Sequence, residues 1–111
     1  MKYLTRQEEL ILLSIFHLKG KAYLVTIRKH LMELTGKNWS IGAVYVPLNR
    51  LHQTGYLDTT IGEPNAKRGR NSIKYYRLTK KSFEALEEIK KVSDTAWMGF
   101  SKVAYNISDC R

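Results

Sequence analysis

SIGAVYVPLNRLHQTGYL, residues 40–57, contains a complete helix together with its start and stop signals. Ser40 is a residue type that caps helix N-termini, and Gly55 can adopt the left-handed conformation that ends a helix. Apolar side chains recur between them at spacings of three, four and three, which places them on one helical face. These side chains are Ile41, Val44, Leu48 and Leu51. Pro47 removes one backbone hydrogen bond and predicts a local bend. The other face carries small, amide and cationic groups, namely Ala43, Tyr45, Val46, Asn49, Arg50 and Gln53.

Two further helices are predicted before this stretch. Thr5 and Glu8 fit a capping box, in which each side chain satisfies a free backbone N–H at a helix start. The apolar run that follows them predicts a first helix over about residues 5–18. A second apolar set then recurs at spacings of three, four and three and ends at Gly36, which predicts a second helix. Its members are Leu24, Ile27, Leu31 and Leu34.

Two segments of alternating character follow Gly55. YLDTTIGEP (56–64) and SIKYYRL (72–78) are rich in β-branched and aromatic residues, and NAKRG (65–69) interrupts the pattern between them. This arrangement predicts a β-hairpin with a long basic loop, supported by the helices because two strands alone are marginally stable. Tyr75 and Tyr76 point to opposite faces of their strand, so at least one of them is expected in the core.

Residues from Thr79 onward predict a final helix of about 25 residues. Apolar and small residues recur there at alternating spacings of three and four, as in a helix that packs along a seam. They are Leu86, Ile89, Ser93, Ala96, Phe100, Val103 and Ile107. The order of elements predicts a mainly α fold with a β-hairpin, which is a winged helix-turn-helix over residues 1–78 followed by a long C-terminal helix over 79–111, in one compact unit.

The charge of the chain narrows the classes of partner. It has 19 Lys and Arg against 10 Asp and Glu, a net charge of +9, and residues 22–78 alone hold nine cations and three anions. Such an excess favours nucleic acid as a partner, and no apolar run is long enough to span a membrane. The N-terminus lacks the features of a signal peptide, and the single Cys110 excludes an intrachain disulfide. We therefore expect a cytoplasmic protein.

Two motifs resemble the PadR-like family of transcriptional regulators, and the resemblance covers about residues 5–92. In the third helix the matching residues are Ser40, Gly42, Tyr45, Leu48, Arg50, Leu51 and Gly55, and in the hairpin they are Arg68, Gly69, Arg70, Tyr75, Tyr76, Arg77, Leu78 and Thr79. The family often places a proline directly after the tyrosine, whereas this chain has Val46 there and Pro47 one residue later. The resemblance implies a homodimeric repressor that binds a short inverted repeat in double-stranded DNA. Some members of the family respond to phenolic acids or planar drugs.

The third helix and the hairpin loop hold the candidate DNA-binding residues. An asparagine can pair with adenine in the major groove, and small apolar groups can meet a thymine methyl group, whereas Tyr45 and Arg50 are expected on phosphates. The loop cations are expected on the phosphate backbone or in the minor groove. The full set is Ser40, Ala43, Tyr45, Val46, Asn49, Arg50, Lys67, Arg68, Arg70 and Lys74. The alternatives are a plain amphipathic helix and a solvated charged loop.

The final helix is the candidate dimer interface. Its small residues allow two copies to approach closely, and its apolar residues would bury area that a small monomer leaves exposed. The predicted interface consists of Leu86, Ile89, Ser93, Ala96, Trp97, Phe100, Val103 and Ile107. Trp97, Met98 and Phe100 are also candidates for binding a planar aromatic effector, with packing in the dimer core as the favoured interpretation.

The sequence gives no support for catalysis. His17, His30 and His52 are single and scattered, and the lone cysteine cannot form a zinc cluster. No glycine-rich phosphate loop or serine elbow is present, so neither a cofactor nor a metal is expected. Two alternative functions are a winged-helix protein-interaction module and a small-molecule sensor.

Overall fold

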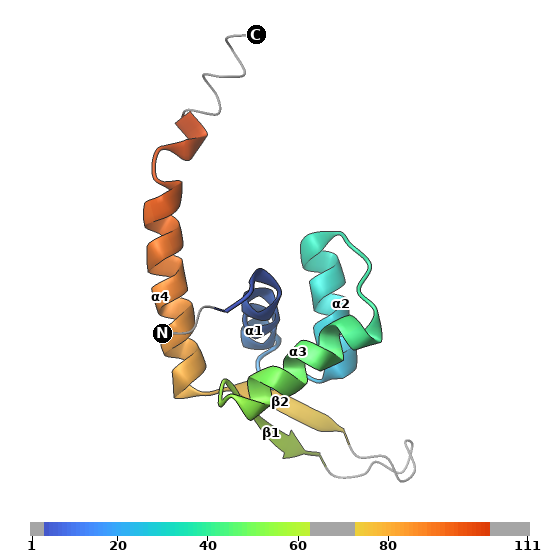
Figure 1. Cartoon of the computed structure of the whole chain (residues 1–111). Coiled ribbons are helices and arrows are strands. Elements are labelled where there is room, and N and C mark those ends of the chain that lie inside the picture. Colours follow the sequence, from blue (N-terminus) through green and yellow to red (C-terminus); the bar gives the residue numbers. More distant parts are fainter. Residues whose placement is uncertain (1–3, 63–72, 103–111) are drawn as a thin grey trace.

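A computed structural model describes residues 4–62 and 73–102 of the chain. Its elements follow the order α1, α2, α3, β1, β2 and α4, as drawn in Figure 1. Three helices form a compact body above a two-stranded hairpin, and α4 stands at one side and projects beyond that body. The prediction of a mainly α winged helix with one hairpin is confirmed.

Local caps define the first three helices. In α1 (Arg6–Leu18), the Thr5 hydroxyl accepts from the Glu8 N–H at 3.1 Å while the Glu8 carboxylate accepts from the Thr5 N–H at 2.8 Å, which confirms the capping box. Helix α2 (Leu24–Thr35) ends at Gly36, whose positive φ of 70° suits glycine. Helix α3 (Ile41–Gln53) begins at Ser40, whose hydroxyl accepts from the Ala43 N–H at 3.1 Å.

The predicted core placement of two residues is wrong. Leu34 at the end of α2 and Ile41 at the start of α3 are exposed, although both lie on the apolar spacing. Each lies in the terminal turn of its helix, beyond the region where α1, α2 and α3 cross. Trp39 in the intervening turn is buried instead, and its indole N–H donates to the Thr35 hydroxyl at 3.0 Å.

The hairpin packs against the helices through one face. Strands β1 (Leu57–Ile61) and β2 (Lys74–Leu78) are antiparallel, with Leu57 opposite Leu78 and Thr59 opposite Tyr76. The Tyr76 N–H also donates to the Ala22 carbonyl at 2.8 Å, which ties β2 to the segment between α1 and α2. Tyr76 is buried and Tyr75 is only partly buried, so the expectation that at least one enters the core is confirmed.

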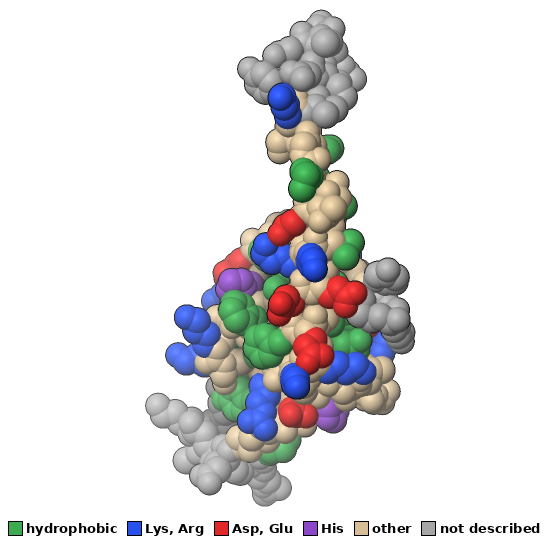
Figure 2. Space-filling model, turned by 90° about the vertical axis from the view of Figure 1, so that its left-hand side faces the viewer, with side chains coloured by type: hydrophobic (Ala, Val, Ile, Leu, Met, Phe, Trp, Pro, Cys, Tyr) green, Lys and Arg blue, Asp and Glu red, His purple; other side chains and the backbone are tan. Residues whose placement is uncertain are grey.

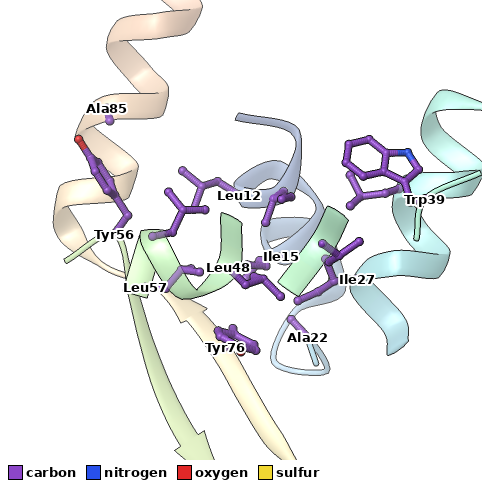
Figure 3. Close-up of a cluster of buried hydrophobic side chains, with 14 residues drawn as sticks. Leu12, Ile15, Ala22, Ile27, Trp39, Leu48, Tyr56, Leu57, Tyr76 and Ala85 are labelled. Carbon is purple, nitrogen blue, oxygen red and sulfur yellow. The ribbon is translucent and has the colours of Figure 1, made fainter. Parts of the chain in front are cut away.

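One hydrophobic cluster joins the helices to the hairpin, and Figure 3 shows its side chains. Leu12 and Ile15 come from α1, Ile27 from α2, and Leu48 from α3. Leu57 and Tyr76 enter the same cluster from the two strands. The position of the hairpin beside α3 is therefore fixed by shared core packing.

Helix α4 (Lys80–Trp97) is shorter than predicted. It ends at Met98, whose ψ is 125°, and Gly99 has a positive φ of 78°, so a break separates it from the helical residues 100–102. The alternating spacing does not reveal this break, because Gly99 occupies none of the seam positions. Phe100 therefore does not continue the seam of α4, and Val103 and Ile107 lie outside the described residues.

Candidate nucleic-acid interface

The outward face of α3 is a narrow stripe of small and amide side chains. Val44, Pro47, Leu48 and Leu51 are buried, so the opposite side of the helix carries the stripe. It consists of Gly42, Val46, Asn49 and Gln53. Val46 is 54% exposed, and a Cβ built on Gly42 would meet no atom within 4 Å. A flat helical face of this composition can approach the base edges of a major groove.

Two predicted contact residues flank this stripe on opposite sides. Tyr45 lines a hollow of about 280 Å³ with Tyr23 of the α2 cap, Lys74 and the buried Tyr76. Burial raises the pKa of the Tyr76 phenol, and the neighbouring Tyr45 raises it further. Tyr45 therefore lies on the hairpin side of α3, where a phosphate group would also be in reach of Lys74.

Arg50 lies on the other flank and faces α1. Its guanidinium approaches the buried carboxylate of Glu8 at 4.0 Å, while about half of the arginine side chain remains exposed. A phosphate would have to compete with Glu8 for this cation. The binding of Arg50 to the DNA backbone stays a prediction.

Ser40 and Ala43 lie at the first turn of α3. The serine hydroxyl is engaged in capping the helix through the Ala43 N–H, and both side chains are exposed. The hydroxyl is thus committed to the helix, while other N–H groups of the first turn remain candidates for a phosphate.

The described part of the hairpin contains one of its predicted cations. Lys74 lies opposite Ile61 at the open end of the strands, and its ammonium group lies 5.7 Å from the centre of the Tyr76 ring. Lys67, Arg68 and Arg70 lie outside the described residues.

Sequence reasoning did not include Gly42, Gln53 and Tyr23 among the candidate contact residues. The helical period places Gly42 and Gln53 with Val46 and Asn49, so a fuller use of periodicity would have found them. Tyr23 comes from another element, and only the fold brings it within the hollow that Tyr45 lines.

The histidines have structural partners. His30 shares a hydrogen bond of 2.9 Å with the buried Ser14, and its ring stacks on that of His17 at 5.7 Å. Within residues 4–62 and 73–102, no three His, Cys, Asp or Glu side chains form a group that could hold a metal ion. Across that same part of the chain, every helix is too short or too polar to cross a membrane.

No known protein-family model matches the chain, and no curated protein matches its sequence. Solved structures do match its fold. H. salinarum RosR has a TM-score of 0.68 at 20% identity, covering 96% of this chain and 92% of that protein. A PadR family transcriptional regulator from Eggerthella lenta has a TM-score of 0.68 at 24% identity, covering 89% and 84%. A PadR-like transcriptional regulator from Bacillus cereus has a TM-score of 0.63 at 24% identity, covering 90% and 88%. The chain therefore has the winged-helix fold of solved PadR-family transcriptional regulators, as its sequence motifs predict.

Proposed function

We propose that this protein is a sequence-specific transcriptional regulator that binds double-stranded DNA as a homodimeric repressor of an inverted-repeat operator. The observation that carries the proposal is the outward stripe of α3, which presents Val46, Asn49 and Gln53 beside the hairpin. Helix α3 enters the major groove, and the cationic hairpin loop contacts the phosphate backbone or the minor groove.

The charge distribution and the structural relatives support this proposal. The net charge of +9 is concentrated in residues 22–78, which contain both α3 and the hairpin. The structural relatives from E. lenta and B. cereus are named as transcriptional regulators, which favours membership of the PadR-like family. A regulator of this kind acts where the DNA lies, in the cytoplasm, and works without a catalytic group or a cofactor.

A planar aromatic effector is a secondary element of the proposal. Trp97 and Phe100 are exposed, and their rings meet edge to face at 4.8 Å. A flat ligand could stack on the open face of either ring, but packing against a second copy uses the same surface. We assign that surface to the dimer.

Fluorescence anisotropy tests the DNA-binding function. The probe is duplex DNA from the region upstream of the protein's own gene, compared with a scrambled duplex at low and at physiological salt. We expect a preference of at least about tenfold for the first duplex and a steep fall in affinity with salt. Equal binding to both duplexes would contradict sequence-specific regulation, and absence of binding to either would favour a protein-interaction module.

The hairpin loop provides a second measurement with a matched control. The double variant Arg68→Ala/Arg70→Ala should weaken binding to every duplex alike and reduce the salt slope by about 0.9 for each phosphate that the loop no longer neutralises. The control Lys80→Ala/Lys91→Ala removes the same charge from exposed positions on α4. If both double variants changed the salt slope equally, the loop would have no special role in binding.

A further inference from the structure

An apolar groove runs between α1 and α4, away from the candidate DNA interface. Its volume is about 500 Å³, and its floor contains Leu13 and Phe16 from α1 and Phe83 and Leu86 from α4. Phe16 and Phe83 are each 50% exposed, although their rings meet edge to face at 6.5 Å. Figure 2 shows hydrophobic side chains gathered beside α4 on this side of the molecule. The groove is large enough to receive aromatic side chains.

The stripe of α4 that lines this groove continues to the end of the helix. Its positions recur at spacings of three, four, three and four residues, which keeps them on one face. They are Phe83, Leu86, Lys90, Ser93 and Trp97. Trp97 is 62% exposed and Phe100 is 49% exposed, and together they form an edge-to-face pair that we call the aromatic knob. The part of α4 that carries the knob projects beyond the helical body (Figure 1).

The groove and the knob are placed so that two copies can fill one another's grooves. In an antiparallel pair of α4 helices related by a two-fold axis, residues equally far from the axis face each other. The groove centres near Leu86 and Glu87, and the knob centres between Trp97 and Phe100, so their midpoint lies at Val92 and Ser93. The groove and the knob are about 18 Å apart along the helix at 1.5 Å per residue. Ser93, at the midpoint, is small enough for the two helices to cross closely.

The charges at the two sites are complementary. The groove is bordered by Glu9 and Glu87, whereas Lys102 lies just beyond the knob and is exposed. An antiparallel pair would bring the Lys102 side chain of each copy toward the acidic border of the other. Such exposed pairs contribute little stability, but they favour this orientation over a parallel one.

We propose that the aromatic knob of one copy fills the α1–α4 groove of a second copy, reciprocally, about a two-fold axis near Ser93. This inference rests on the homodimer of the proposed function and names the surfaces that form it. It replaces the predicted seam of Leu86, Ile89, Ser93 and Ala96 by the neighbouring stripe that includes Phe83 and Trp97. It also adds α1 to the interface through Leu13 and Phe16.

Analytical ultracentrifugation combined with tryptophan emission tests the arrangement. The emission of Trp97 is obtained as the difference between the wild-type protein and the Trp97→Phe variant, because Trp39 is buried within its own subunit. We expect a dimer whose Trp97 emission moves to longer wavelength on dilution to monomer. Phe16→Glu should raise the dimer dissociation constant at least about tenfold and cause the same emission shift without dilution.

Leu34→Glu is the matched control, because Leu34 is 51% exposed but lies on α2, outside the groove. It should change neither the dissociation constant nor the emission, and far-ultraviolet circular dichroism checks that both variants are folded. A dimer whose Trp97 emission is insensitive to Phe16→Glu would overturn the inference, and so would a wild-type protein that remains monomeric at about 100 µM or above.

DNA binding distinguishes a failure of this inference from a failure of the proposed function. Preferential binding to the upstream duplex by a protein whose dimer leaves Trp97 exposed would preserve the function and overturn the groove assignment. A dimer with the expected Trp97 shift that binds no duplex would support the groove assignment and contradict the regulatory function.

Discussion

Asn49 lies half-buried in the middle of the outward stripe of α3, between Val46 and Gln53. Its amide has the donor and acceptor needed to pair with adenine, whereas Val46 offers only apolar contact. We expect Asn49→Ala to reduce discrimination between the operator and a duplex with one substituted adenine by about 1–3 kcal/mol. The salt slope should stay unchanged, because a neutral amide displaces no counterions from the DNA. Gln7→Ala, an exposed amide on α1, is the control for both anisotropy measurements.

Tyr76 gives the fold a dependence on alkaline pH. Burial raises the pKa of its phenol above the ordinary value of about 10, with a further contribution from Tyr45. The folded state therefore favours the neutral phenol, so the stability associated with it is complete below about pH 10 and is lost as the pH rises through the folded-state pKa. Tyr76→Phe should flatten the fall in the free energy of unfolding above about pH 10, measured by urea denaturation. An equal fall in both proteins would assign the effect to other groups.

Lys81 joins two elements that are separate in the sequence. Its ammonium group donates to the Thr54 carbonyl at 2.7 Å, at the C-terminal end of α3, and lies 4.5 Å from the centre of the Tyr56 ring. The side chain thus satisfies a terminal carbonyl and neutralises the negative end of the α3 dipole. We expect Lys81→Met to lower the free energy of unfolding by about 1 kcal/mol, measured by urea denaturation. The neighbouring Lys80→Met should have little effect, since Lys80 makes only an exposed pair with Glu84 at 3.9 Å.

The same elements show why some features could be predicted from the sequence and others could not. The starts of α1 and α3 follow from side chains that bond backbone groups three residues away, so the sequence contains the whole signal. The exposure of Leu34 depends on where α2 crosses its neighbours, which periodicity does not contain. The groove between Phe16 and Phe83 needs α1 and α4 side by side, and no local pattern predicts that contact.

Across the whole molecule the charges are divided between the two proposed surfaces. Residues 22–78 hold most of the cationic excess, whereas residues 79–111 hold six cations and five anions. On α4 these include the exposed pair of Lys90 and Asp94 at 2.6 Å. A nearly neutral α4 lets two copies approach without strong repulsion, while the positive charge remains beside α3 for the DNA.

The two-fold dimer makes a prediction about the spacing of DNA half-sites. Two copies of α3 related by the axis near Ser93 would read two half-sites on one face of the duplex, one helical turn or a multiple of it apart. Inserting about 5 base pairs between the half-sites turns one of them to the opposite face, so one α3 loses its site. Since the second binding event in a linked pair adds a factor of about 100 or more, we expect affinity to fall by at least about tenfold. An insertion of about 10 base pairs restores the face and is the control, expected to bind more tightly than the shorter insertion. Anisotropy with the three duplexes measures the effect, and equal affinity for all three would mean that one copy of α3 recognises the operator alone.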